Sequence, residues 1–250
     1  MDPMNPTPPS APTRLSDVVP ADGQTRIVAL TGAGISASAG LGTFRGPGGL
    51  WTGNPDLEEA LHARYLPGNV PLLWQVWGGL RARAQAAGPT PGHRALAVCG
   101  TTIITQNVDG LHQDAGSAPV IEVHGSAARS RCLDRRCGWH GQSAYAVGAP
   151  DPPCPRCGGP QRPDLVLFGE SLDPLVWAAA ETAAQCCDVF LAVGTSAFVT
   201  PAKWLVPIAR DAGALCVNVN IDDVPPPADP FHVHVIGTAD SVLSQWVADG

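Results

Sequence analysis

The chain has 250 residues, 44% of them apolar, which is enough to build the core of one ordinary domain. Its formal net charge of −7 excludes the basic footprint typical of nucleic-acid-binding domains. It has neither an apolar run of about 18 residues nor a basic N-terminal region followed by an apolar stretch. We therefore expect no membrane span and a cytoplasmic location, where cysteines are more often metal ligands or buried thiols than disulfides.

Five short apolar runs begin after residues 1–23, whose prolines and small polar residues predict a disordered tail. Each run ends at glycine or polar residues, as buried strands do. The runs are Arg26–Leu30, Thr101–Thr105, Val120–Val123, Asp188–Val193 and Ala214–Val219. Helical patterns lie between several of them, at Gly92–Ala97, Leu175–Gln185 and Pro201–Ala212. The alternation predicts an α/β fold with a parallel sheet covered by helices on both faces.

Two segments interrupt the alternation. Residues 51–92 are rich in Trp, Leu and Ala and predict a helical insertion, whereas residues 129–163 contain four cysteines and little periodicity. We therefore expect one domain over residues 24–250, with its core formed by residues 24–50, 93–128 and 164–247. Ligands of such a sheet bind beyond the carboxyl ends of the strands, so we expect one large site there.

The four cysteines of the second segment form two closely spaced pairs, Cys132 with Cys137 and Cys154 with Cys157. Two tight turns that each present two thiolates are what a closed, structural Cys₄ zinc site requires. The alternative is four unrelated core cysteines, and His140 is a possible substitute ligand. The other four cysteines lie in apolar surroundings and are interpreted as core residues; they are Cys99, Cys186, Cys187 and Cys216.

A glycine-rich turn follows the first predicted strand. Residues 32–37 match G-x-G-x-x-G/A, in which glycines let backbone N–H groups approach a phosphate. The motif alone is weak, because no clear acidic residue ends a second strand, although Asp56 is at about the right distance. Phe44 and Arg45 follow in a Gly-rich segment that could cover the nicotinamide end of a dinucleotide, or could be an ordinary surface loop.

Polar residues end two further strands. Gln106, Asn107 and Asp109 follow the second strand, and His124 ends the third. Buried polar groups are costly unless they bind something polar, so these side chains could hold ribose hydroxyls and a carboxamide. Asp109 could equally cap the following helix. A lone histidine is usually structural, but its place at a strand end beside the other polar ends favours catalysis.

Taken together, these motifs resemble the sirtuin family over about residues 24–247. The matching residues are Gly32–Ser36, Phe44–Arg45, Gln106–His112, His124–Gly125, Arg162–Glu170, Gly194–Ser196, Pro201–Ala202 and Asn220. The resemblance implies a Rossmann-like fold with a smaller module made of the zinc ribbon and the helical insertion. It also implies an NAD-dependent protein deacylase that acts on acyl-lysine proteins or peptides and binds neither nucleic acid nor membrane.

The resemblance also implies roles for individual residues. His124 would be the general base, and Asn107 would act with it at the nicotinamide end. The NAD site would comprise Gly32, Ala33, Gly34, Ser36, Phe44, Arg45, Gln106, Asn107, Asp109, Gly194, Thr195, Ser196, Asn220 and Ala239. The substrate backbone would pair with Val166, Leu167, Phe168 and Gly169 as an added strand.

The sequence departs from the family pattern in two places. Members that remove acidic acyl groups usually carry Tyr-x-x-Arg on the helix before the Gly-His-Arg-Ala segment, where this chain has Trp77 and Leu80. Arg81 and Arg83 are out of register, so we expect an apolar acyl pocket that favours acetyl or longer uncharged groups. In the cofactor loop, Gly42 replaces a common proline, which should make the loop more mobile and could raise unproductive NAD hydrolysis.

Three alternative functions compete with deacylation. A NAD glycohydrolase or mono-ADP-ribosyltransferase on the same scaffold would keep His124 but would not need the intact Arg162–Glu170 segment. A non-catalytic NAD sensor or zinc-ribbon binding module would be expected to have lost His124 or Asn107, and both are present. An ordinary dehydrogenase is disfavoured because the glycine turn lacks its usual ribose-binding acid.

Overall fold

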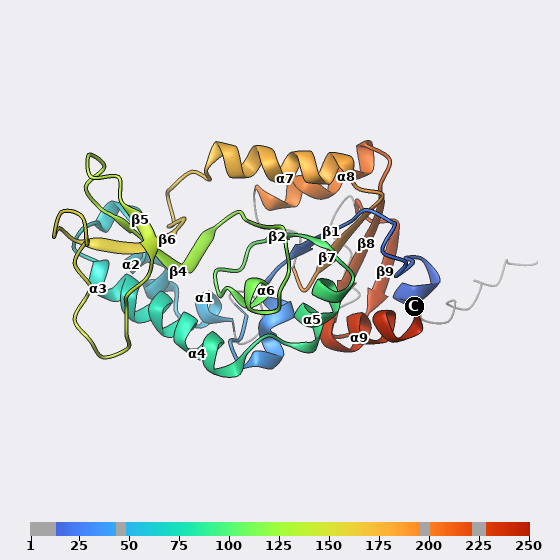
Figure 1. The fold of residues 1–250 in the computed structure, drawn as a ribbon, viewed down its shortest axis with the longest axis horizontal. Helices are drawn as coiled ribbons and strands as arrows, with labels where there is room; N and C mark the ends of the chain where they lie inside the picture. The colour runs from blue at the N-terminus through green and yellow to red at the C-terminus, as the bar shows by residue number, and fades with distance from the viewer. Residues whose placement is uncertain (1–13, 44–48, 196–200, 222–228) are drawn as a thin grey trace, which may run out of the picture.

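The computed structural model describes residues 14–43, 49–195, 201–221 and 229–250. Its main sheet has six parallel strands in the order β3-β2-β1-β7-β8-β9 (Figure 1). Their bounds are β1 Ile27–Thr31, β2 Thr102–Thr105, β3 Val120–Glu122, β7 Val189–Val193, β8 Leu215–Asn220 and β9 Val233–Ile236. The predicted parallel sheet is therefore confirmed, with each of the five expected strands in place. Strand β9 was not predicted from the sequence, because its valines alternate with His234 and do not form a continuous apolar run.

Helices cover both faces of this sheet, as predicted. Helices α5 (Pro91–Val98) and α9 (Ala239–Asp249) lie on one face, and α7 (Pro174–Cys186) and α8 (Leu205–Asp211) lie on the other (Figure 1). Successive residues of β1 alternate between the two cores: Ile27 and Ala29 pack beneath α9, while Val28 and Leu30 pack beneath α7 and α8. The strand is buried on both sides, which explains its continuous apolar sequence.

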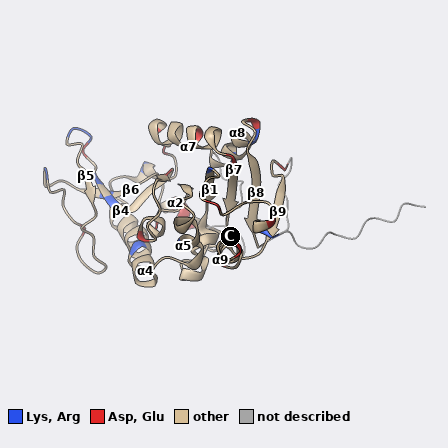
Figure 2. Ribbon diagram, turned by 45° about the vertical axis from the view of Figure 1, so that its right-hand side comes forward, with Lys and Arg blue, Asp and Glu red and all other residues tan. Residues whose placement is uncertain are grey.

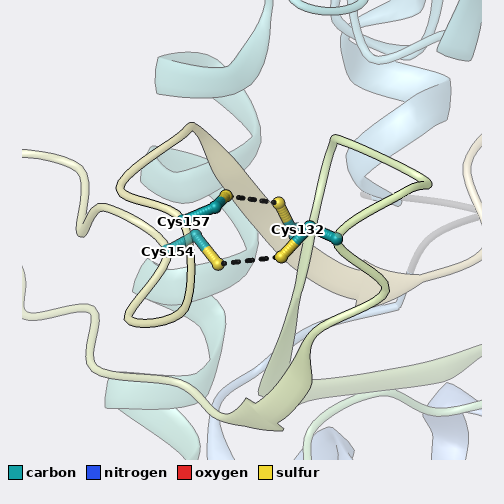
Figure 3. A group of neighbouring side chains, drawn as sticks. Cys132, Cys154 and Cys157 are labelled. Carbon is teal, nitrogen blue, oxygen red and sulfur yellow. Dashed lines mark hydrogen bonds between the residues drawn. The ribbon is translucent and has the colours of Figure 1, made fainter.

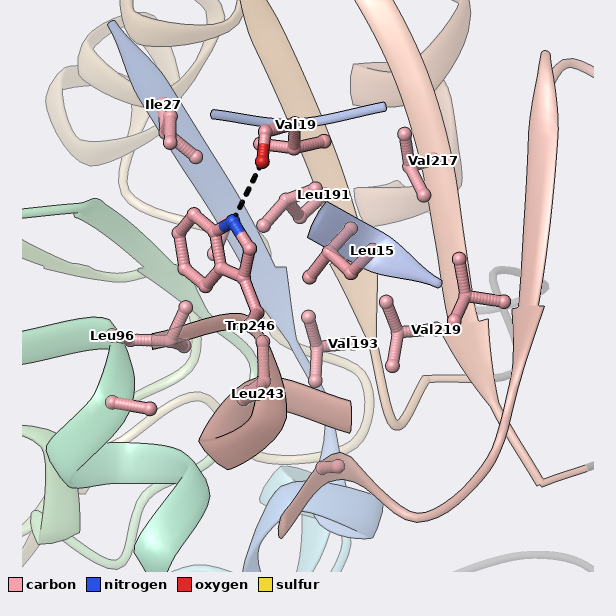
Figure 4. Packing of buried hydrophobic residues seen from close by; sticks show 14 of the residues in the cluster. Leu15, Val19, Ile27, Leu96, Leu191, Val193, Val217, Val219, Leu243 and Trp246 are labelled. Carbon is pink, nitrogen blue, oxygen red and sulfur yellow. Dashed lines mark hydrogen bonds between the residues drawn. The ribbon is translucent and has the colours of Figure 1, made fainter. Parts of the chain in front are cut away.

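The predicted N-terminal tail, residues 1–23, is too long, because residues 14–23 pack against the domain. A 3₁₀ turn, η1 (Leu15–Asp17), packs against α9, and Leu15 and Val19 are 2% and 1% exposed. The indole of Trp246 donates a hydrogen bond to the Val19 carbonyl at 2.8 Å (Figure 4). Residues 14–23 therefore complete the core. The sequence did not indicate that Leu15 and Val19 are buried, because prolines and polar residues surround them. Residues 1–13 lie outside the described part of the chain.

A second layer of structure lies at one end of the sheet (Figure 1). The helical insertion comprises α1 (Leu50–Gly53), α2 (Pro55–Ala60), η3 (Ala63–Tyr65), α3 (Val70–Leu73), η4 (Trp74–Gly78) and α4 (Gly79–Ala87). Beside it is an antiparallel sheet of order β5-β4-β6, made of β4 (Gly125–Cys132), β5 (His140–Gln142) and β6 (Gln161–Leu165). The remaining short helices are η2 (Ala33–Ala39), α6 (Leu111–Asp114) and η5 (Ala202–Trp204).

An aromatic stack joins the insertion to the small sheet. The rings of Trp74 and Tyr145 are stacked with centroids 5.1 Å apart, and the Trp74 indole donates to the Gln161 carbonyl. Gly78 provides the space, because a Cβ atom there would lie 2.3 Å from the Tyr145 ring. The two parts therefore form one packed module, although the exact domain boundaries stay a prediction.

Charge is unevenly distributed over the two parts. Six of the fifteen basic residues fall between residues 125 and 165, and Figure 2 shows basic segments around β4 and β5. They are Arg129, Arg131, Arg135, Arg136, Arg156 and Arg162. Among the described helices, none combines the length and the apolar character needed to cross a bilayer.

Candidate functional site

A cavity of about 1360 Å³ lies beyond the carboxyl ends of β1, β2, β7 and β8 and continues between the main sheet and the small module. It is lined by the glycine turn after β1, the polar residues after β2, His124, and the segment between β6 and α7. The strand ends singled out in the sequence thus meet in one site, as parallel topology requires. Phe44, Arg45 and Ser196 lie outside the described residues.

The glycine turn is built for close backbone contact. The N–H groups of Gly32 and Gly34 donate to the carbonyls of Val193 and Gly194 at 3.1 and 2.8 Å. A Cβ atom on Gly34 would lie 2.6 Å from the Gly194 Cα. Both glycines therefore let the turns after β1 and β7 touch. The expectation that their N–H groups approach a phosphate is revised, since those groups are already bonded, and Ala33 is the turn residue between them.

Asn107, Ser36 and Asp109 form a buried hydrogen-bonded cluster at the cavity wall. The Asn107 side-chain amide donates to the Gly32 carbonyl at 3.0 Å and to Ser36 Oγ at 3.2 Å. Ser36 Oγ donates to Asp109 Oδ2 at 2.7 Å. The other Asp109 oxygen accepts from the backbone N–H of Leu111, the first residue of α6, although the N-cap residue of that helix is Gly110 and not Asp109. The cluster fixes the direction in which Asn107 presents its remaining amide oxygen.

A second group of contacts forms the opposite side of the cavity. Gln106 Nε2 donates to Thr195 Oγ1 at 2.9 Å, and Asn220 Nδ2 donates to the Thr195 carbonyl at 3.1 Å. Ala239 begins α9 and also lines the cavity. The described residues predicted for the cofactor therefore line one cavity, except Ser36 and Asp109. Ser36 bonds to Asn107, and Asp109 bonds to Ser36.

His124 lies between these groups and the small module. Its Nδ1 atom is 3.0 Å from the Gln106 carbonyl oxygen, which can only accept, so Nδ1 carries the proton and Nε2 is the basic atom of the neutral ring. Burial lowers the pKa of His124 below its ordinary 6.5, and the hydrogen bond to Gln106 opposes that shift. The ring is therefore neutral at pH 7 and able to accept a proton.

The segment between β6 and α7 is held by an ion pair that the sequence analysis did not identify. The Arg162 guanidinium, 2% exposed, donates to Glu170 at 2.6 Å, and Glu170 in turn accepts from the Leu167 N–H at 2.9 Å. The Val166 N–H donates to the His124 carbonyl at 2.9 Å. The Phe168 carbonyl is already occupied, since it accepts from the Ala63 N–H at 3.0 Å. The predicted strand pairing with substrate therefore has one backbone acceptor fewer, because the Phe168 carbonyl already bonds to Ala63.

Aromatic rings close the far end of the cavity. Trp51 makes edge-to-face contacts with Trp77 and Phe168, with centroids 5.9 and 5.5 Å apart. Arg81 points away from this end and bonds the Asp109 carbonyl and the Asp114 carboxylate. Among the described residues that line the cavity, none is Arg or Lys. The expectation of an apolar pocket without a cationic clamp thus agrees with these described residues.

The four predicted zinc ligands converge at the tip of the small module (Figure 3). Their sulfur atoms all lie within 4.8 Å of one another, with Sγ–Sγ distances of 3.6 Å for Cys132 and Cys157 and 3.8 Å for Cys137 and Cys154. Tetrahedral zinc with bonds of about 2.3 Å places its sulfurs roughly 3.8 Å apart. The donor set and spacing therefore fit structural zinc. The alternative ligand His140 lies instead beside Asp164.

The other four cysteines fit the core interpretation with one exception. Cys187 and Cys216 are buried and Cys99 is half-buried, but Cys186 is exposed on α7. That expectation was wrong for Cys186 because the last turn of α7 turns this side chain outward.

Two buried histidines, which carry no distinctive sequence signal, lie behind the cofactor-side residues. The rings of His93 and His112 are in edge-to-face contact at 4.6 Å. Burial lowers the pKa of His93 to about 4 and that of His112 well below 6.5. The folded chain therefore binds fewer protons than the unfolded chain between these values.

We expect the contribution of His93 to the free energy of unfolding to be complete above pH 6.5 and to be lost as the pH drops toward 4, because unfolding then lets His93 take up a proton. For this residue the loss should be on the order of 3 kcal/mol. Urea unfolding of the wild type and His93→Gln between pH 7.5 and 4.5 measures it. The difference between the two chains removes the effects of carboxylates and thiols. If the free energy of unfolding depended on pH equally in both chains, the lowered pKa of His93 would be contradicted.

We expect about one zinc ion per chain, retained by the wild type and by Cys186→Ser but lost in Cys132→Ser. Elemental analysis and thermal unfolding of the three proteins test this. The exposed Cys186 is the matched control, since it changes a thiol without touching the cluster. Full zinc content in Cys132→Ser would exclude the four-thiolate site.

Comparisons with known proteins agree with this site. The model of the Sir2 family matches residues 32–201. A protein described as NAD-dependent protein deacylase 2 from Pyrobaculum aerophilum is 42% identical over 233 residues, which cover 89% of this chain and 90% of that protein.

Solved structures give the same picture. A Sir2 homologue variant in complex with ADP-ribose superposes with a TM-score of 0.82 at 33% identity, covering 91% of this chain and 93% of that one. Another variant, in complex with 2′-O-acetyl ADP-ribose, gives a TM-score of 0.80 at 34% identity and covers 91% of this chain and 92% of that one. Both the sequence match and the fold extend over nearly the whole chain. The chain therefore belongs to the Sir2 family.

Proposed function

We propose that this chain, an NAD-dependent protein deacylase, removes acetyl or other uncharged acyl groups from protein lysines with His124 as general base. The observation that carries the proposal is the placement of the basic Nε2-bearing ring of His124 on the wall of one cavity. That cavity has a polar cofactor side at Asn107 and an apolar aromatic end at Trp77. A base, a cofactor site and an acyl site in one space are what a transfer from lysine to NAD requires.

NAD is a co-substrate that lies across the ends of β1, β7 and β8 in this proposal. Its pyrophosphate is near Ala33 and the start of η2, and the adenosine is near Thr195, Asn220 and Ala239. The nicotinamide end faces Asn107, supported by Ser36, Asp109 and Gln106. Phe44 and Arg45 would cover it from the adjoining loop. The hydrogen bonds that fix Asn107 and Thr195 support this placement.

The acyl-lysine enters from the small-module side, beside Val166, Leu167, Phe168 and Gly169. The acyl carbonyl oxygen attacks C1′ of the nicotinamide ribose, the glycosidic bond breaks, and nicotinamide leaves. His124 Nε2 then accepts the proton of a ribose hydroxyl, whose oxygen attacks the acyl carbon. The bond between the acyl carbon and the lysine nitrogen then breaks, water adds to that carbon, and free lysine and O-acyl-ADP-ribose leave. The reaction takes place in the cytoplasm, and the finding that none of the eight cysteines forms a disulfide supports that location.

The Glu170 ion pair favours deacylation over simple NAD hydrolysis. A glycohydrolase needs no ordered peptide segment, whereas here a buried guanidinium, Arg162, holds Glu170 and thereby Leu167. A buried ion pair is costly to form, so its presence beside the cavity favours a role in holding the peptide-binding segment.

We expect nicotinamide release from NAD to require an acetyl-lysine peptide and to yield deacetylated peptide in equal amount. His124→Ala should lower turnover by roughly 100-fold or more, because His124 is the only histidine among the described residues that line the cavity. Product analysis by mass spectrometry with and without peptide measures both. The exposed His140, which does not line the cavity, provides the control variant His140→Ala for a general effect of losing a histidine. Equal release without peptide, and no deacetylated product, would move the function to NAD hydrolysis or ADP-ribosyl transfer.

We expect acetyl and butyryl peptides to be turned over at least about 10-fold faster than a succinyl peptide, since a carboxylate in the aromatic end would be buried without a partner. Competition between matched peptides measures the ratio of kcat/KM. Leu80→Arg, which places a guanidinium at the register position of the missing clamp, should narrow the ratio. A wild-type preference for succinyl would contradict the apolar pocket.

A further inference from the structure

A chain of hydrogen bonds runs from α6 to the backbone of Asn107. His112 in α6 is 1% exposed, and its Nε2 atom lies 2.9 Å from Thr31 Oγ1. Thr31 Oγ1 donates to Thr105 Oγ1 at 2.9 Å, and Thr105 Oγ1 accepts the backbone N–H of Asn107 at 3.0 Å. The two threonines end β1 and β2, so the chain links His112 to the strand ends that form the cavity.

The proton order along this chain follows from the direction of the bond between the two threonines, in which Thr31 is the donor. The Thr31 hydroxyl has one proton and gives it to Thr105, so its oxygen must accept from His112 Nε2–H. In a neutral ring the His112 Nδ1 atom is then bare. That atom is buried and has no hydrogen-bond partner among the described residues.

The ring of His93 lies beside it. His93 Nδ1 is 2.8 Å from Thr90 Oγ1 and 3.3 Å from the Thr90 backbone nitrogen. His93 Nε2 is likewise buried and without a hydrogen-bond partner among the described residues. The two rings meet in an edge-to-face contact with centroids 4.6 Å apart. Burial lowers the pKa of both histidines, so both rings are neutral at pH 7.

Through Thr90, the His93 ring is also linked to η2, which follows the glycine turn. Thr90 Oγ1 donates to the Ile35 carbonyl at 3.0 Å, one residue before Ser36. The charged groups facing the pair are Asp109, Asp240 and Arg94. Neither histidine lines the cavity, so any effect on the reaction passes through other residues.

We propose that His112 is a positioning residue for the proposed deacylation: its Nε2–H orders the Thr31–Thr105 hydroxyl pair, which sets the backbone of Asn107 against the nicotinamide end of NAD. This inference rests on the proposed function for the role of Asn107. Loss of the Nε2–H frees the Thr31 hydroxyl to reorient, and the bond from Asn107 N–H to Thr105 loosens. A displacement of about 1 Å in such a group is enough to slow a reaction by roughly 100-fold.

The matched pair His112→Gln and His112→Asn tests this. The Gln amide nitrogen reaches the Nε2 position, whereas the shorter Asn amide reaches only the Nδ1 position. We expect His112→Asn to lower kcat for nicotinamide release by about 10- to 100-fold with the KM for peptide unchanged, and His112→Gln to recover most of it. Equal losses in both variants, or wild-type kcat in His112→Asn, would overturn the proposal.

Variants of Thr105 provide an independent test, in case the His112 variants fail to fold. Thr105→Val removes the acceptor for Asn107 N–H with little change of shape, and Thr105→Ser keeps it. We expect the Val variant alone to show the fall in kcat, at a melting temperature close to that of the Ser variant. Equal kcat in the two would contradict the chain of bonds. The wild type separates the hypothesis of deacylation from the positioning role of His112. If the wild type releases nicotinamide without peptide, deacylation is contradicted. The ratio of kcat between each variant and the wild type still tests the role of His112.

Discussion

The contact between the turns after β1 and β7 is the constraint on which the rest of the site depends. Gly34 and Gly194 approach so closely that a Cβ atom on either would lie 2.6 Å from the backbone of the other turn. This contact sets the spacing of the two strand ends and starts η2, which carries Ser36. Ser36 then bonds both Asn107 and Asp109, and Gln106 reaches back to Thr195. The polar wall is therefore one connected network.

The small module contributes the other wall and must be held rigidly to do so. The zinc ligands fix its tip, the Trp74–Tyr145 stack fixes its side, and the Arg162–Glu170 pair fixes its junction with the cavity. None of these contacts touches the cofactor residues. Their shared effect is to hold His124, whose carbonyl bonds the Val166 N–H, between a polar and an apolar region. Stability and chemistry are thus divided between the two parts of the chain.

Much of this arrangement could be predicted from local sequence signals. Buried parallel strands are continuous apolar runs, and paired thiols have a diagnostic spacing, so β1, β7 and the zinc ligands were identifiable. The contacts of Gly34, the occupied carbonyl of Phe168 and the His93–His112 pair could not be, because each depends on residues far apart in the chain. Strand β9 and the anchors Leu15 and Val19 were missed because short or interrupted apolar patterns carry little signal by themselves.

The transfer of the acyl oxygen to ADP-ribose is the most direct test of the central claim. An acetyl-lysine peptide labelled with oxygen-18 at the acyl carbonyl would be turned over with NAD, quenched early, and its products weighed by mass spectrometry. The proposed attack on C1′ predicts that the label appears in the ADP-ribose portion of the O-acetyl-ADP-ribose. Label retained in free acetate, with unlabelled ADP-ribose, would mean that lysine deacylation and NAD cleavage are separate hydrolyses, and would contradict the account.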